Sequence, residues 1–203
     1  MRWGWALASA LALFGGCKGE PVDPFHGGTD SDSDTDSDTD ADAGDPAEDC
    51  DPSAAGWSEE WAELEAQIVE IVNDVRTDGA DCGDAGVFDA AEPLVMEPHL
   101  QCAARVHSLW MGDNNQFSHD SPGGPLGDNE YERVQNAGYE GIALGENIAA
   151  IASEPEEVVD MWVGAGTQCA KLMNPAATET GVGYALVSSS TNDHFWTQEF
   201  GTQ

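Results

Sequence analysis

The chain has 203 residues, with 39 Asp and Glu against 6 Lys and Arg, which gives a formal net charge of -33 at pH 7. Such a balance repels phosphate, so the composition argues against nucleic-acid binding and against electrostatic attachment to an anionic membrane. The length suits one domain of ordinary size, once an N-terminal segment that is cleaved off and a disordered linker are subtracted.

The first predicted segment is a signal peptide over residues 1–17. Arg2 precedes an apolar run from Ala6 to Phe14, which is about half of the roughly 20 residues that a membrane-spanning helix needs. Cys17 follows two glycines directly. This end resembles the bacterial lipobox, which implies that Cys17 carries lipid and anchors the exported protein in a membrane of the cell envelope. The alternative is ordinary secretion into the extracellular medium, with cleavage nearby.

Residues 18–55 are predicted to form a disordered acidic tether. Asp alternates with Ser, Thr and Ala from Thr29 to Asp42. Nothing in this segment can be buried to offset the entropy of ordering, and its like charges repel one another. We expect a solvated spacer that holds the domain of residues 56–203 off the membrane. One functional hypothesis is that this spacer matters more than any site on the domain.

Four cysteines remain after Cys17, and they are predicted to form disulfides because an even number in an oxidising compartment favours pairing. Their spacing matches no standard zinc pattern, and three pairings are open. The four are Cys50, Cys82, Cys102 and Cys169.

Two helices are predicted first in the domain. Apolar residues recur every three or four positions from Trp61 to Val75, which predicts a helix that begins near Ser58 and ends before Gly79. A second helix is predicted from Glu97 to Met111. It carries His107 on its apolar face, where we expect a hydrogen-bonded core histidine.

The later part of the domain is predicted to mix helices and strands. A short helix is expected from Tyr131 to Ala137, and another starts at Ser153, with Ser153 and Glu156 as a capping box. Gly181–Val187 and Phe195–Phe200 are β-like segments separated by a polar turn, which predicts an antiparallel hairpin. Helices followed by a closing hairpin predict an α+β domain.

Five short segments are distinctive together and in this order: Ile71–Arg76, Ala103–Ser108, Phe117–Ser121, Gly145–Ala149 and Trp196–Gln198. They resemble the CAP superfamily, also called SCP-like or pathogenesis-related-1-like extracellular domains, and in particular its bacterial secreted members. The resemblance runs from about residue 65 to the end of the chain. It implies an α-β-α sandwich, with a small antiparallel sheet between helical layers and an open cleft over the sheet.

In that family a cleft with two histidines and two glutamates is the usual candidate site, and a divalent metal such as zinc sometimes binds through the histidines. His119 matches the first histidine and Glu146 matches the first glutamate. The resemblance places the second glutamate at Ala165. It places the second histidine at Gln168 in bacterial members and at Phe195 in eukaryotic members. His194 is next to Phe195, but neighbouring strand residues point to opposite faces.

His119 and Glu146 therefore predict an acid–base pair, or two ligands of an incomplete metal site with His119 as the metal-ligand candidate. The amide of Gln168 cannot titrate and is a poor zinc ligand. We therefore favour a binding domain, presenting its cleft to a lipid, a glycan or another protein, over an enzyme. The alternative is an envelope hydrolase or protease that uses His119 and Glu146, with a serine hydrolase through Ser118 or Ser121 as a third choice. An alternative of equal standing to catalysis is that His119 and Glu146 hold the loops around the cleft by hydrogen bonding.

Overall fold

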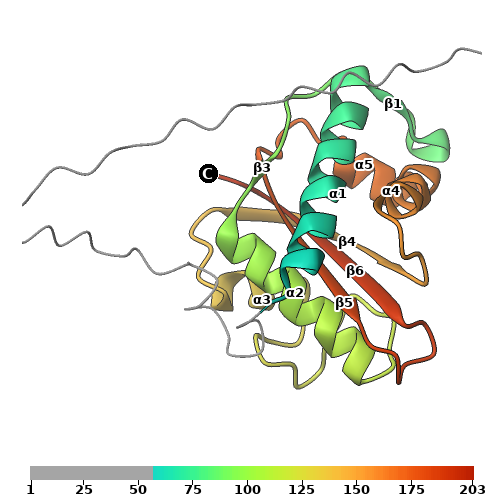
Figure 1. Ribbon diagram of the computed structural model, residues 1–203. Coiled ribbons are helices and arrows are strands. Elements are labelled where there is room, and N and C mark those ends of the chain that lie inside the picture. The colour runs from blue at the N-terminus through green and yellow to red at the C-terminus, as the bar shows by residue number, and fades with distance from the viewer. Residues whose placement is uncertain (1–56) are drawn as a thin grey trace, which may run out of the picture. The chain divides into compact units, whose positions relative to one another are not determined.

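The computed structural model describes residues 57–203 (Figure 1). The predicted signal peptide, the predicted lipidation site at Cys17, the predicted tether and Cys50 lie outside the described residues. None of the helices within residues 57–203 is both long enough and apolar enough to cross a membrane.

The described domain contains five α-helices, one short 3-10 helix and six strands. In chain order these are α1 (Glu59–Asp78), β1 (Ala80–Asp81), η1 (Gly83–Ala85), β2 (Val87–Phe88), β3 (Val95–Met96), α2 (Pro98–Asp113), α3 (Glu130–Asn136), β4 (Ile142–Ala150), α4 (Pro155–Gly164), α5 (Gly166–Leu172), β5 (Glu179–Leu186) and β6 (His194–Thr202).

The main sheet has the strand order β3-β5-β6-β4. The predicted hairpin is confirmed, because β5 and β6 pair antiparallel, and β4 pairs antiparallel with the outer side of β6. One detail differs from the expected antiparallel sheet, since the two-residue strand β3 runs parallel to β5. The sheet is therefore mixed at this edge.

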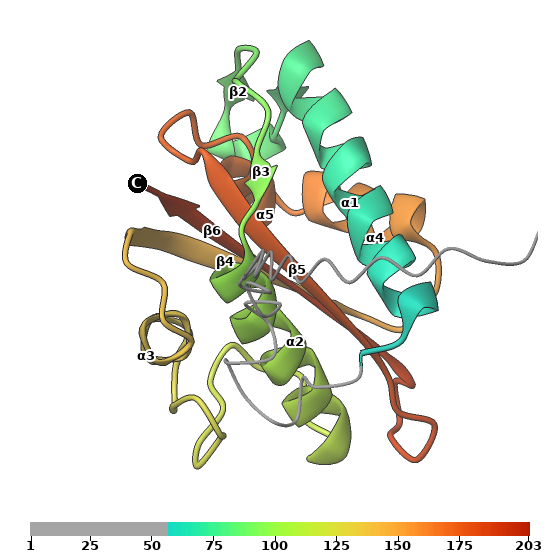
Figure 2. The ribbon, with the colours of Figure 1, turned by 60° about the vertical axis from the view of Figure 1, so that its left-hand side comes forward.

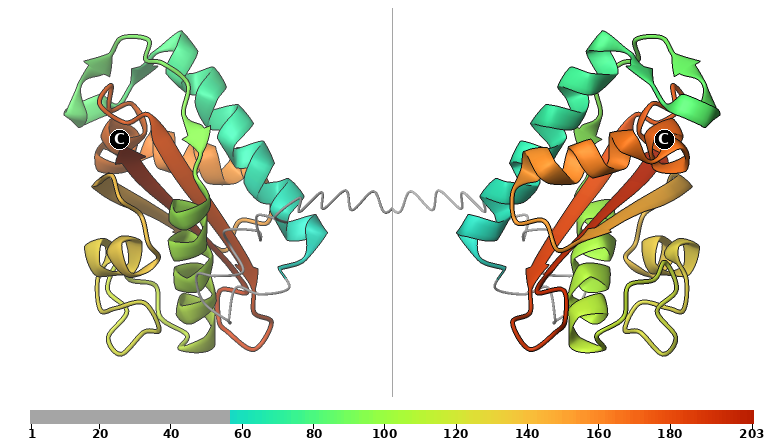
Figure 3. Two further views of the ribbon diagram at one scale, coloured as in Figure 1. Left: turned by 90° about the vertical axis from the view of Figure 1, so that its left-hand side faces the viewer. Right: turned by 90° about the vertical axis from the view of Figure 1, so that its right-hand side faces the viewer.

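Helices cover both faces of the sheet, which confirms the α-β-α sandwich (Figures 2 and 3). On one face α1, α4 and α5 form the largest core cluster with strand residues such as Val182, Trp196 and Phe200. On the other face lie α2 and α3, and α2 packs Met111 against Phe195. Alternation along the strands separates these two sets of side chains.

The first two helices form where the apolar periodicity predicts them. Ser58 caps α1 by accepting a hydrogen bond from the Trp61 backbone N–H at 3.1 Å. Glu97 caps α2 by accepting one from the Leu100 N–H at 2.7 Å, and α2 continues two residues past Met111 to Asp113. Side-chain oxygens at these positions satisfy amide groups that the first helical turn leaves without partners.

The predicted start of the fourth helix is wrong. α4 begins at Pro155, Glu154 occupies the cap position, and no side-chain capping bond forms. Proline has a fixed φ and no N–H, so it suits the first helical position and moves the boundary past Ser153. The Ser153 hydroxyl instead donates to the Glu154 carboxylate at 3.2 Å, and the capping box with Glu156 is absent.

A disulfide joins Cys82, beside η1, to Cys169 in α5 with a Cα–Cα distance of 5.5 Å. It is one of the pairs that the sequence left open. Cys102 is disulfide-bonded as well. Bonds of this kind typically contribute about 2–5 kcal/mol to the stability of a small secreted domain.

Two glycines let α2 lie directly on β5. A Cβ atom on Gly183 would lie 2.2 Å from the backbone nitrogen of Arg105, and one on Gly181 would lie 2.0 Å from that of Gln101. Both clashes are with helix backbone, which cannot rotate away as a side chain can. The approach of the two elements therefore requires glycine at both positions.

We predict that Gly183→Ala destabilises the domain by about 3 kcal/mol or more, because α2 must move off the sheet to admit the methyl group. Chemical denaturation monitored by circular dichroism measures the change. Gly164→Ala is the matched control, since a Cβ atom at this helical glycine meets nothing within 4 Å. Equal loss of stability in both variants would contradict the proposed contact.

Candidate functional site

The two residues predicted from motifs lie in direct contact. His119 is in the loop between α2 and α3, and Glu146 is in β4. The His119 Nδ1 is 2.6 Å from Oε1 of Glu146; the imidazole is 45% exposed, whereas the carboxylate is fully buried. The carboxylate thus orients the ring, and Nε2 is left as the ring nitrogen without a hydrogen bond to any described residue.

Arg133 of α3 is the third member of the site, and the motif comparison did not identify it. Its Nη2 contacts Oε2 of Glu146, and its Nη1 donates to the Ser121 hydroxyl at 2.9 Å. Ser121 in turn donates to the Gly127 carbonyl at 2.8 Å. A sequence signal for Arg133 existed, because so acidic a chain has few cations, and a buried carboxylate needs one.

His107 of α2 supports the site from inside. It is fully buried, and its Nε2 lies 2.9 Å from the Ser118 carbonyl and 3.8 Å from Oε2 of Glu146. Burial lowers the pKa of His107 to about 4, although the charge of Glu146 acts in the opposite direction. The ring is therefore neutral at pH 7 and donates Nε2–H to Ser118. The prediction of a hydrogen-bonded core histidine is confirmed.

Glu146 is ionised in this arrangement. Its burial acts to raise its pKa, but the hydrogen bond from His119 and the charge of Arg133 act to lower it, and the pKa lies below its ordinary value. Both carboxylate oxygens accept hydrogen bonds from charged or polar donors, so the buried charge is satisfied.

The same residues offer a partial metal site. One ligand atom each from His119, Glu130 and Glu146 lies within 4.8 Å of the others. However, both oxygens of Glu146 are already bound, one by the Arg133 guanidinium and one by His119. A zinc ion would have to displace a cation from the carboxylate and would still need a ligand beyond these three. The donor set therefore does not fit a resident zinc ion.

The other family positions have structural roles. The Gln168 amide and the Trp162 indole both donate to the Ile148 carbonyl, at 2.9 and 3.1 Å. The Lys171 ammonium donates to the Glu146 carbonyl at 2.7 Å. These three side chains donate hydrogen bonds to backbone carbonyl groups of β4, which is an edge strand of the sheet. Gln168 thus supports the strand that carries Glu146.

Apart from the buried His107, no second histidine joins the site within residues 57–203. Phe195 is buried under α2, and His194 Nδ1 lies 2.7 Å from the Tyr184 hydroxyl, in the core layer of α1 and α4. The neighbouring serines are also engaged elsewhere. The Ser118 hydroxyl accepts from the Asp120 N–H, and neither Ser118 nor Ser121 hydrogen-bonds His119. The geometry therefore gives no support to a serine nucleophile.

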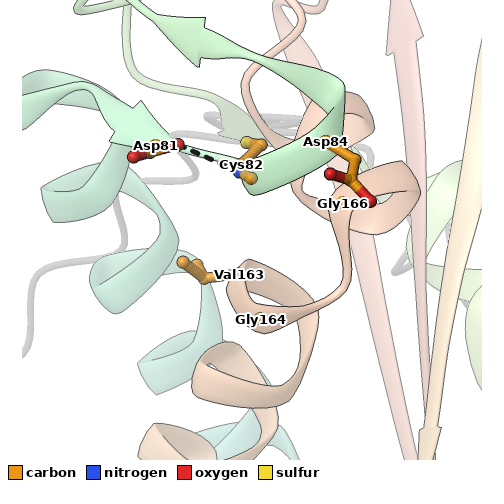
Figure 4. Close-up of a pocket in the computed structure, with 7 residues that line it drawn as sticks. Asp81, Cys82, Asp84, Val163, Gly164 and Gly166 are labelled. Atoms are coloured by element: carbon orange, nitrogen blue, oxygen red, sulfur yellow. Dashed lines mark hydrogen bonds between the residues drawn. The ribbon is translucent and has the colours of Figure 1, made fainter.

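A separate pocket of about 440 Å³ opens beside the disulfide (Figure 4). It lies between Asp81 at the end of β1 and Asp84 of η1 on one side and the junction of α4 and α5 at Gly164 and Gly166 on the other. Asp81 is used locally, because its carboxylate accepts from the Gly83 N–H at 3.0 Å. Of the predicted site residues, this pocket includes Cys82 and not the pair at His119.

We predict that zinc titrated calorimetrically into the protein shows no tight stoichiometric binding at His119, because both Glu146 oxygens are occupied. Wild type and His119→Ala should give the same isotherm at neutral pH. His99→Asn is the control, since His99 is 38% exposed and bonds a glutamate at 2.7 Å in the same manner. Tight binding lost in His119→Ala alone would contradict this assignment.

We predict that Arg133→Gln destabilises the protein by about 3–5 kcal/mol at neutral pH, because Glu146 would remain buried without its cation. Lys171→Met removes a positive charge from the same neighbourhood but leaves that ion pair intact, and should cost about 1 kcal/mol or less. Urea denaturation of the two variants measures the difference. Similar losses would show that the Arg133 pair has no special weight.

The comparison with known proteins identifies the family of this chain. The model of the cysteine-rich secretory protein family, CAP, matches residues 69–200. The uncharacterized protein YkwD of Bacillus subtilis (strain 168) is 32% identical over 138 residues, which cover 67% of this chain and 46% of YkwD.

Two solved structures share the fold. An extracellular protein containing an SCP domain from Bacillus anthracis has a TM-score of 0.56 at 29% identity, covering 70% of this chain and 41% of that one. An outer surface protein of Borrelia burgdorferi has a TM-score of 0.51 at 16% identity, covering 72% of this chain and 94% of that one. This chain spans less than half the length of YkwD and of the Bacillus anthracis protein. By sequence and by structure, the chain is a bacterial member of the CAP superfamily.

Proposed function

We propose that this protein is exported, is anchored through lipid on Cys17, and binds an extracellular glycan at the surface around His119. The observation that carries the proposal is the half-exposed imidazole, whose Nδ1 is fixed at 2.6 Å from a fully buried carboxylate. When Nδ1–H donates to this carboxylate, Nε2 is presented as a rigid acceptor for a ligand hydroxyl. A fixed acceptor binds with little loss of side-chain entropy.

Two exposed aromatic side chains favour a sugar over other ligands. Phe117 is 51% exposed and lies two residues before His119; Tyr131 is 58% exposed and follows Glu130, whose carboxylate belongs to the same cluster. Aromatic faces with polar groups beside them suit a ligand that has both apolar C–H faces and hydroxyl groups. The acidic surface disfavours anionic ligands, so a neutral glycan fits best.

Export and anchoring are supported by the signal-peptide and lipobox-like pattern of residues 1–17. The Bacillus anthracis relative is described as extracellular, which agrees with an exported location. The tether of residues 18–55 would then separate the domain from the membrane. Its like charges favour an extended chain.

Hydrolysis is the alternative function, and the oriented His119–Glu146 pair favours it. Such a pair can act as a general base toward water, which typically accelerates a reaction by about 10²–10⁴-fold. Binding is preferred because no nucleophile hydrogen-bonds His119 within the described domain and because the donor set does not fit a zinc ion.

The test is a titration of ¹⁵N-labelled protein with a neutral N-acetylglucosamine oligosaccharide, followed by NMR. We expect shifts centred on His119 and Tyr131. His119→Asn should weaken binding about tenfold or more, because Asn replaces Nδ1 but not Nε2, and the loss of one hydrogen bond costs about 1.4 kcal/mol. His99→Asn should leave the affinity unchanged.

Other outcomes redirect the proposal. Shifts produced by phosphatidylcholine vesicles instead of the oligosaccharide would assign a lipid ligand. Release of new reducing ends, or of peptides from casein, that falls at least a hundredfold in His119→Asn would establish the hydrolase. No shift at His119 with any neutral oligosaccharide would reject the glycan.

A further inference from the structure

A second buried carboxyl group lies beside Glu146. In the register of β4 and β6, Glu146 stands opposite Glu199, so their side chains share one face of the sheet. The two residues are 0% and 1% exposed. On its other side Glu199 faces Gly181 of β5, where the backbone of α2 closes over the sheet. Water is thus kept from both carboxyl groups.

One cation serves this pair. Within residues 57–203, Arg133 is the only Arg or Lys that forms an ion pair with either carboxyl group, and its Nη2 contacts Glu146 but lies 4.0 Å from Oε1 of Glu199. That Glu199 oxygen has no hydrogen-bond partner among the described residues. An ionised carboxylate in such a place would be both buried and poorly paired, which is costly. A proton on Glu199 removes that cost.

We propose that Glu199 is a positioning residue of the His119 site: it carries a proton shared with Glu146 and thereby holds Glu146 as the ionised acceptor of His119. The inference deepens the proposed binding function and rests on it for its biological meaning.

The electrostatics of the pair agree with this assignment. Burial, and then the charge of Glu146, raises the pKa of Glu199 well above its ordinary value, whereas the pKa of Glu146 is lowered. A hydrogen bond between the two carboxyl groups also raises the pKa of Glu199 and lowers the pKa of Glu146. Two adjacent carboxyl groups with one proton between them behave in this way. The charged and titratable groups that face the pair are Arg133, Glu130 and Tyr131 of α3, His107 of α2, and His119 of the loop.

The shared proton decides what His119 offers to a ligand. With Glu199 protonated, the charges of Glu146 and Arg133 balance, and the His119 Nδ1–H donates to Glu146 while Nε2 is left as the acceptor. Ionised Glu199 would place a second negative charge behind Glu146 and favour the imidazolium, whose two nitrogens both donate. The proton on Glu199 thus keeps the outer nitrogen as an acceptor.

The first test is a ¹³C NMR titration of the side-chain carboxyl groups in the whole protein, without ligand. The Glu199 carboxyl should remain protonated well above pH 4.5, while Glu146 remains ionised at neutral pH. Glu140, an exposed glutamate, is the internal reference. Titration of Glu199 together with Glu140 would overturn the proposal.

The second test is the pH dependence of the melting temperature in Glu199→Gln, a neutral variant of the same shape. A carboxyl whose pKa is raised on folding stabilises the protein below its unfolded pKa near 4.5, and this contribution is lost as the pH rises through the folded value. Glu199→Gln should therefore melt at a higher temperature than wild type at pH 8–9. Its melting temperature should also lack the decrease with rising pH that the Glu199 carboxyl causes in wild type. Glu140→Gln should follow wild type.

In Glu199→Gln the ¹⁵N signals of the His119 ring should match those of the wild type, with Nδ1 protonated and Nε2 free to accept a hydrogen bond. A Glu199→Gln variant that is less stable than wild type at pH 8–9 would mean that ionised Glu199 pairs with Arg133, and would overturn the proposal. Failure of the glycan proposal looks different, because the oligosaccharide would then produce no shifts while the carboxyl titration still reported the shared proton.

Discussion

The carboxylate of Glu146 is the constraint on which the rest of the site depends. A strand, a helix and a loop meet at its two oxygens, through Glu146 itself, Arg133 and His119. Because an unpaired buried charge is expensive, these three elements must be in place together for any of them to be stable. His107 extends the constraint by fixing the Ser118 carbonyl, next to His119. The loop before α3 is therefore held at both its backbone and its side chains.

Short-range sequence patterns correctly predicted two helices and the C-terminal hairpin. α1 and α2 follow an apolar period of 3.6, and the β5–β6 hairpin follows strand composition around a polar turn. β4 was not predicted as a strand, because Glu146 and Asn147 are both buried polar residues and remove the alternation that marks a strand. α4 starts later than predicted because Pro155 outweighs the Ser153 cap.

The same division applies to the site. His119 and Glu146 were found because each lies in a short motif, whereas Arg133 and Glu199 lie in segments where a charged residue normally indicates a solvated face. Only the tertiary structure places them beside Glu146. Sequence reasoning could infer that a buried glutamate needs a cation, but not which helix supplies it. Register between β4 and β6 likewise cannot be read from either strand alone.

The side chains that saturate β4 have a consequence for the protein outside its site. A strand of nine residues at the end of a sheet would otherwise offer free carbonyl groups as a template for another chain. Trp162, Gln168 and Lys171 occupy the carbonyls of Glu146 and Ile148 from the helical side. Wherever copies of this domain meet, these three side chains block edge-to-edge pairing between them.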